Sequence, residues 1–112
     1  MRYSMSCLAL ALLASVISAA PAQEEQKATA KPDAQKGLAL AQQWCATCHV
    51  VSSEQSKGTD AAPSFQTFAR RADFNSEKLA FFLLDPHPAM PKMSLTRDEA
   101  RDIAAYIARL RE

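Results

Sequence analysis

The sequence is short of glycine and of cysteine, and it has no excess of charge of either sign. Its 112 residues include two glycines, too few for a sheet protein with many tight turns. With 13 lysines and arginines against 12 aspartates and glutamates, the formal net charge is +1. The chain therefore lacks the excess of positive charge that is typical of nucleic-acid-binding proteins. The length allows one domain at most. Alanine is abundant and no alternating strand pattern or repeat appears, so we expect an all-α fold.

A hydrophobic run long enough to span a membrane is also missing. The longest uncharged apolar segment, Cys7 to Ala20, is shorter than the roughly 20 residues of a membrane-spanning helix. Arg2 precedes it, and a small-x-small cleavage sequence follows at residues 20–22. We therefore predict a cleaved signal peptide over residues 1–22, export to the periplasm and no membrane span afterwards. The alternative is that the segment is kept as an uncleaved anchor.

The three cysteines cannot all pair within one chain. Cys7 lies inside the predicted signal peptide without a lipid-attachment sequence before it, so we expect it to be discarded. Cys45 and Cys48 remain, and an oxidising compartment makes a disulfide between them the simplest expectation. Loss of Arg2 leaves equal numbers of acidic and basic side chains, so the exported chain has no formal net charge.

The exported chain divides into a linker and one ordered domain. Residues 23–32 carry no large apolar side chain and are predicted to be a disordered linker, followed by the domain at 33–112. Asp33 is a suitable N-cap for a first helix. Its apolar residues recur at helical spacing and are predicted to share one face: Leu38, Ala41, Cys45 and Cys48.

Three further helices are predicted after a polar loop at residues 49–63. They are a short one at 64–71, one that begins at Asn75 or Ser76 and ends near residue 84, and a C-terminal one. Thr96 and Glu99 form a capping box for the last helix. Its inward residues are predicted to be Ile103, Ala104, Ile107 and Leu110. So few helices form a small core, which predicts that something besides side chains fills the middle.

Residues 45–49 read Cys-Ala-Thr-Cys-His, the attachment sequence of a c-type haem. Two thiols three residues apart on a helix lie on one side and can each bond a vinyl group, and His49 can then reach the iron as the proximal ligand. Two alternatives remain. The cysteines could form a thiol–disulfide redox pair, or they could bind zinc together with His49 and His87.

The second axial ligand of such a haem has three candidates, which are His87, Met90 and Met93. Methionines more often serve in packing than as ligands. Met90 is favoured because the prolines at 88 and 91 restrict the loop that carries it, so its thioether can be held in place at little entropic cost.

With these motifs the sequence resembles the class I c-type cytochromes, over residues 33–112. Gly37 matches the helix-packing glycine of that family, and Cys45, Cys48 and His49 match its haem motif. Further matches are residues 62–65 (Ala-Pro-Ser-Phe), Met90-Pro91 and residues 104–107 (Ala-Ala-Tyr-Ile). One departure is Ala41, where the family often has an aromatic residue. Trp44 directly precedes the motif instead, and its side chain is expected either to pack at the helix crossing or to cover a haem edge.

The resemblance implies a cytochrome c fold of three to four short helices around one covalent haem c, with the N- and C-terminal helices crossing. It implies that the Pro63 carbonyl accepts the ring N–H of His49, and that His49 and Met90 ligate the iron. Five apolar residues are candidates for the wall around the haem: Phe65, Leu79, Phe82, Leu83 and Ile107.

The function implied is that of a periplasmic, monomeric electron carrier rather than an enzyme. Its partners would be redox proteins, either membrane respiratory complexes or a periplasmic dehydrogenase or oxidase. Alternatives are a dedicated subunit of a dehydrogenase complex, a haem-based sensor or enzyme, and a thiol–disulfide protein. Lys57 and Lys92 could flank the haem crevice, whereas Arg70 and Arg71 are expected to be ordinary surface charges.

Overall fold

The computed structural model describes residues 30–59, 61–86 and 88–112. The predicted signal peptide, most of the linker and His87 lie outside the described residues. The described part contains four helices and no strand: α1 (Ala34–Trp44), α2 (Phe65–Ala69), α3 (Ser76–Leu84) and α4 (Arg97–Arg109). The all-α prediction is therefore confirmed. None of these helices is long and apolar enough to cross a membrane.

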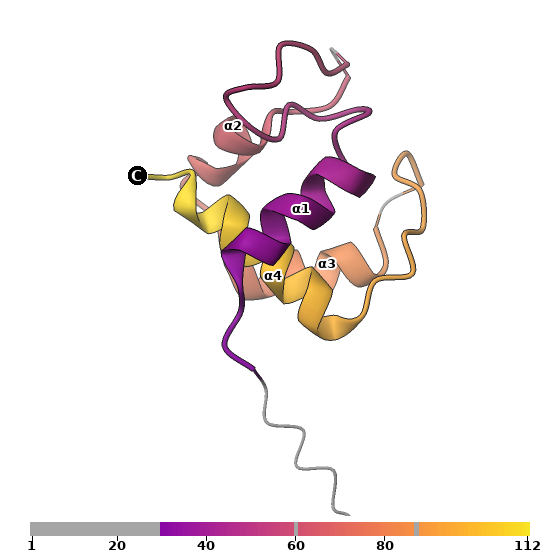
Figure 1. Ribbon diagram of the computed structural model, residues 1–112, viewed down its shortest axis with the longest axis vertical. Helices are drawn as coiled ribbons and strands as arrows, with labels where there is room; N and C mark the ends of the chain where they lie inside the picture. Colours follow the sequence, from indigo (N-terminus) through magenta and orange to yellow (C-terminus); the bar gives the residue numbers. More distant parts are fainter. Residues whose placement is uncertain (1–29, 60, 87) are drawn as a thin grey trace, which may run out of the picture.

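The first and last helices cross in the middle of the molecule, and two loops extend from the helices at the top and right of the view (Figure 1). Gly37 makes the crossing close. A Cβ atom at this position would overlap the backbone carbonyl of Asp102 and lie 3.0 Å from the Ile103 nitrogen. The predicted helix-packing role of Gly37 is confirmed, since only a residue without a side chain lets the two backbones approach this closely.

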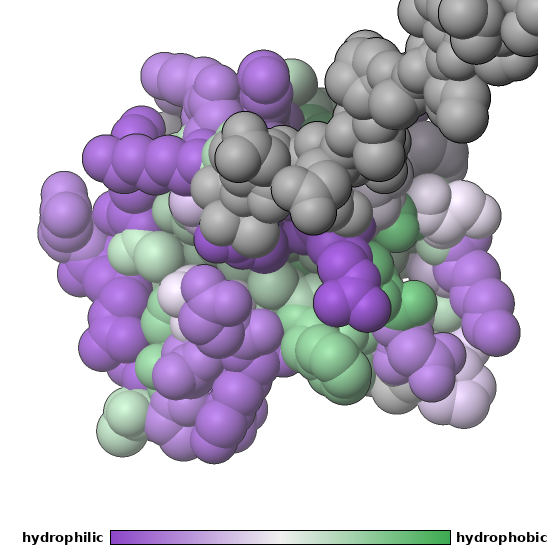
Figure 2. Space-filling view, turned by 90° about the horizontal axis from the view of Figure 1, so that it is seen from below, coloured by the Kyte–Doolittle hydropathy of each residue, from purple (hydrophilic) through white to green (hydrophobic). Residues whose placement is uncertain are grey.

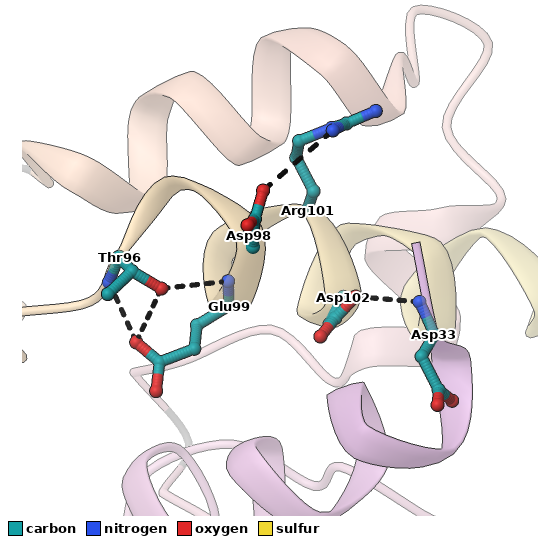
Figure 3. Close-up of polar contacts among 6 residues, drawn as sticks. All are labelled: Asp33, Thr96, Asp98, Glu99, Arg101 and Asp102. Carbon is teal, nitrogen blue, oxygen red and sulfur yellow. Dashed lines mark hydrogen bonds and ion pairs between the residues drawn. The ribbon is translucent and has the colours of Figure 1, made fainter. Parts of the chain in front are cut away.

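Asp33 caps α1 with its side chain and binds α4 with its backbone N–H (Figure 3). The Asp33 carboxylate accepts hydrogen bonds from the backbone N–H groups of Lys36 at 3.3 Å and Gln35 at 2.9 Å, which lower its pKa. The backbone N–H of Asp33 donates to Asp102 Oδ1 at 2.6 Å. Asp102 therefore joins the two helices that cross, although its partner lies 69 residues away in the sequence.

Helix α4 begins with the predicted capping box. Thr96 Oγ1 accepts the Glu99 backbone N–H at 3.2 Å, and the Glu99 carboxylate accepts the Thr96 backbone N–H at 2.7 Å (Figure 3). These bonds to the charged carboxylate lower the pKa of Glu99. One turn on, the Arg101 guanidinium and the Asp98 carboxylate are 3.9 Å apart, a distance that contributes little at the surface.

Helices α2 and α3 are also capped, by Ser64 and Asn75, and both pack on α4. In α3, Leu79 and Leu83 are buried as predicted. Phe82 is different, because 41% of it is exposed. In the part of the chain that the structure describes, four large hydrophobic residues are exposed, and three of them belong to this helix: Phe81, Phe82 and Leu84, with Trp44 as the fourth. Seen from below, the surface is mainly hydrophilic, with a patch of hydrophobic residues near the middle (Figure 2).

Candidate haem site

The Cys45–His49 segment continues from the end of α1 as a series of turns. The prediction that Cys45 and Cys48 both lie on a helix face was wrong, because α1 ends at Trp44. The Cys45 carbonyl instead accepts the backbone N–H groups of Cys48 at 3.1 Å and His49 at 2.8 Å. This tight turn buries Cys45, which is 5% exposed, and leaves Cys48 at the surface.

The carbonyl groups that come directly after α1 are bonded by the following loop, so the helix does not continue through them. Thr59 donates to the Cys48 carbonyl from its backbone N–H at 2.8 Å and from its hydroxyl at 3.3 Å. The Gln55 side chain donates to the carbonyls of Ala46 and His49, each at 2.8 Å. In a continued helix these carbonyls would accept N–H groups four residues further on. Bonds to the loop replace that pattern.

His49 is held by the same loop on its other side. Its ring Nδ1 lies 2.7 Å from the Pro63 carbonyl oxygen, the contact that sequence analysis predicted. A carbonyl can only accept, so Nδ1 must carry the hydrogen, and in the neutral imidazole this leaves the lone pair on Nε2. The Phe65 ring lies 5.3 Å from the imidazole, centroid to centroid, and the Phe65 backbone N–H donates to the Val50 carbonyl at 2.9 Å. The imidazole is therefore fixed in both tautomer and orientation.

Two adjoining cavities open beside this histidine. The larger, of about 470 Å³, is bordered by both cysteines and by Trp44, and the smaller has a volume of about 180 Å³. Four residues line both cavities: Cys45, His49, Pro63 and Met90. The other residues of the smaller cavity are all apolar: Phe65, Phe68, Leu79, Phe82, Leu83 and Ile107.

The lining of these cavities fits a haem. All five residues expected to form the haem wall surround the smaller cavity, which explains why the exposed Phe82 nevertheless faces inward in part. Trp44 lines the larger cavity, and so it lies on the haem side and not in the helix crossing. A large apolar space with two thiols and a free imidazole nitrogen on its rim matches the chemistry of covalent haem attachment.

Comparison with known proteins agrees with this chemistry. The family described as "Cytochrome C oxidase, cbb3-type, subunit III" matches residues 32–107. A protein of Bradyrhizobium diazoefficiens named cytochrome c-552 is 53% identical over 105 residues, which cover 94% of this chain and 91% of that protein. No solved structure matches.

The chain belongs to the class I c-type cytochromes. It is a monohaem electron carrier with a covalently bound haem c, and it transfers electrons to redox partners rather than catalysing a reaction. The motif at residues 45–49, the fold and the relatives therefore lead to one family.

The two methionines predicted as candidates for the second axial ligand differ in position. Met93 is buried, with 7% exposed, and borders the larger cavity alone. Met90 is half-buried and borders both cavities, as His49 does. The third candidate ligand, His87, lies outside the described residues.

The environment of Cys45 is unlike that of a reactive thiol in a redox-active pair. Burial, followed by the influence of Cys48, raises the pKa of Cys45 to about 11, so its thiol is protonated at neutral pH. Reactive C-x-x-C motifs depend on a lowered pKa, and this environment does the opposite. Among the described residues, no group of three or more His, Cys, Asp or Glu could hold a metal ion. The zinc alternative also required His87, which is not described.

The residues that fasten the loop to the haem motif were not predicted from the sequence. A Cβ atom on Gly58 would lie 2.9 Å from the Cys48 carbonyl oxygen and 3.0 Å from the Val50 nitrogen. Gly58 could have been noticed, since it is one of only two glycines. Gln55 and Thr59 carry no such signal, because polar side chains are common in any loop.

Proposed function

We propose that Cys45 and Cys48 carry the haem through thioether bonds, that His49 binds the iron through Nε2 and that Met90 binds from the distal side. The observation that carries the proposal is the 2.7 Å contact between His49 Nδ1 and the Pro63 carbonyl, on the rim of a cavity that both cysteines border. That bond directs the free nitrogen away from the loop and makes the imidazole a better donor. Met90 is favoured over Met93 because it shares both cavities with His49.

The side chains around the site keep the ligands and the surroundings constant during electron transfer. The haem iron supplies the one-electron redox chemistry. Pro63 holds the His49 ring, and the thioether of Met90 favours the reduced state relative to a second histidine. The apolar wall, which includes Leu79, Leu83 and Ile107, excludes water and favours the reduced state further. The protein thus contributes binding, orientation and electrostatics.

The cytochrome is proposed to work in the periplasm as a monomer after removal of residues 1–22. The sequence of that segment supports export, and haem c is suited to an extracytoplasmic space because covalent attachment prevents its loss. Its partners are proposed to be membrane respiratory complexes or a periplasmic dehydrogenase or oxidase. A second candidate role is that of a resident subunit, which the family's description as an oxidase subunit favours. Purification at native expression level distinguishes the two, since a subunit copurifies with its enzyme and a carrier does not.

The attachment is tested by intact mass and visible spectra of protein made in a host with haem-attachment machinery. We expect a mass greater by one haem and cleavage after Ala22. Cys45→Ser and Cys48→Ser should each leave one thioether at most. A wild-type chain without covalent haem would overturn the proposal.

The distal ligand is tested by replacing each methionine with leucine, which keeps a similar volume. Met90→Leu should abolish the methionine–iron charge-transfer band of the oxidised protein, whereas the matched Met93→Leu should retain it. The reverse pattern would show that Met93, and not Met90, is the distal ligand of the iron.

A further inference from the structure

Gln55 is the most densely bonded side chain in the loop that follows the haem motif. Its Nε2 lies 2.8 Å from the carbonyl oxygens of both Ala46 and His49, and 2.6 Å from that of Lys57. Its Oε1 accepts the backbone N–H of Val51 at 3.0 Å. A glutamine amide has two N–H donors and one carbonyl, so every polar atom of this side chain is engaged by main-chain groups.

The four partners of Gln55 lie in two segments that must keep a fixed relation. Ala46 and His49 belong to the haem motif, and they lie on either side of Cys48 in the sequence. Val51 and Lys57 belong to the loop that follows. One side chain therefore closes the loop and fastens it to the backbone on which His49 is carried. Because the group is half-buried, replacing these bonds with water requires local opening.

The same loop touches the motif at two more places, through Thr59 and Gly58. Thr59 donates twice to the Cys48 carbonyl, and Gly58 approaches this carbonyl so closely that a Cβ atom would lie 2.9 Å from it. Further along the same loop, Pro63 accepts the His49 ring N–H. The main-chain carbonyl of His49 is thus bonded by Gln55, and its ring by Pro63.

We propose that Gln55 is a positioning residue for the proximal ligand, an inference that rests on the proposed binding of iron by His49. By holding the His49 carbonyl, it fixes the distance between the imidazole and the Pro63 carbonyl, and with it the strength of the ring N–H···O bond. A histidine that donates a strong hydrogen bond is a more basic ligand, and a more basic ligand favours ferric iron. Gln55 therefore adjusts the reduction potential without touching the haem ligands.

The first test compares charge-neutral variants of the purified holo-cytochrome. Gln55→Met removes every hydrogen bond of the amide while keeping a side chain of similar length, and Gln66→Met is the matched control at an exposed position on α2. We expect Gln55→Met to shift the reduction equilibrium about tenfold toward the ferrous form, or about 59 mV for one electron. Exchange of the His49 ring N–H with solvent should also be at least tenfold faster. Gln66→Met should change neither.

Gln55→Glu separates donation from acceptance, because the carboxylate can still accept from Val51 but donates to no carbonyl. It should accelerate exchange of the His49 ring N–H as Gln55→Met does. Wild-type exchange rates in either variant, or an unchanged potential in Gln55→Met, would overturn the role of Gln55.

If the variants do not acquire haem, a measurement on the wild-type protein tests the proposal instead. The side-chain amide protons of Gln55 should exchange at least tenfold more slowly than those of Gln66, and equal rates would overturn the proposal. The experiments distinguish a failure of the proposed iron binding by His49 from a failure of the positioning role of Gln55. A wild-type spectrum without histidine ligation refutes the ligand assignment, whereas normal ligation with an unaffected Gln55→Met protein refutes the positioning role alone.

Discussion

At the scale of single residues, Gly37 shows how a local preference and a tertiary contact oppose each other. Alanine is the better helix former by about 1 kcal/mol, so an isolated α1 would gain from Gly37→Ala. In the folded protein the new methyl group meets the Asp102 carbonyl, which is backbone and cannot rotate away. We expect a net loss of about 1–3 kcal/mol in the free energy of unfolding, measured by denaturant titration. A stabilised variant would mean that the helix crossing is looser than described.

Tyr106 connects α4 to the loop that carries the haem contacts. Its hydroxyl donates to the Val51 carbonyl at 2.6 Å, and the residue is 8% exposed. Tyr106→Phe should lower the free energy of unfolding by about 1–2 kcal/mol, because that carbonyl loses its side-chain donor. Denaturant titration at pH 7 measures the loss, and an unchanged midpoint would contradict it.

The same hydroxyl predicts a pH dependence. Burial, followed by the nearby Glu54 carboxylate, raises the pKa of Tyr106. A raised pKa means that its stabilisation is complete below the ordinary tyrosine value near pH 10 and is lost as pH rises through the folded value. The stability difference between wild type and Tyr106→Phe should therefore shrink above about pH 10.

At the scale of helices, the cap of α4 is the clearest local signal in the chain. Thr96→Ala removes the oxygen that accepts the Glu99 N–H, and should lower the free energy of unfolding by about 1 kcal/mol. Thr96→Ser keeps an acceptor and is the matched control, with a midpoint close to that of wild type. Equal midpoints for the alanine and serine variants would show that the cap contributes nothing.

The capping box also predicts a response to acid. Hydrogen bonds from Thr96 lower the pKa of Glu99, so their stabilisation is present above the ordinary carboxyl value near pH 4. It is lost as pH falls through the folded value, because the protonated carboxyl group accepts these bonds less well.

The helices that sequence predicted well are those with local boundaries. Asp33, Ser64, Asn75 and Thr96 each cap a helix through neighbours within three residues, and such signals are readable from sequence. The end of α1 was misplaced because its cause is distant: Gln55 and Thr59 take carbonyls from 46–49. The role of Asp102 could not be predicted for the same reason, since its partner Asp33 is 69 residues away in the sequence.

At the scale of the whole molecule, charge is balanced and dispersed. Lys57 and Lys92 are exposed, and Arg71 pairs with Asp73 at 3.0 Å. Without a strong field of one sign, electrostatic steering toward a partner is weak. We expect the second-order rate constant of electron transfer to a soluble partner to change less than about threefold between low and moderate salt.

Stopped-flow kinetics at several ionic strengths measure this dependence. Lys92→Gln tests the exposed charge that lies between Met90 and Met93 in the sequence, and should alter the rate constant no more than Lys31→Gln at the start of the described chain. A steep decline with salt in the wild-type protein would show that a local charged patch steers binding despite the neutral total.

The binding of Asp33 to Asp102 determines where anything attached to the front of this domain must leave it. The chain enters at the first turn of α1, and this helix of 11 residues separates it from Cys45 by about 16 Å. A fluorophore, a fusion partner or an electrode linker joined before residue 33 would therefore emerge at the opposite end of α1 from the haem motif. Tethering by this end should immobilise the cytochrome while its redox centre stays open to a partner in solution.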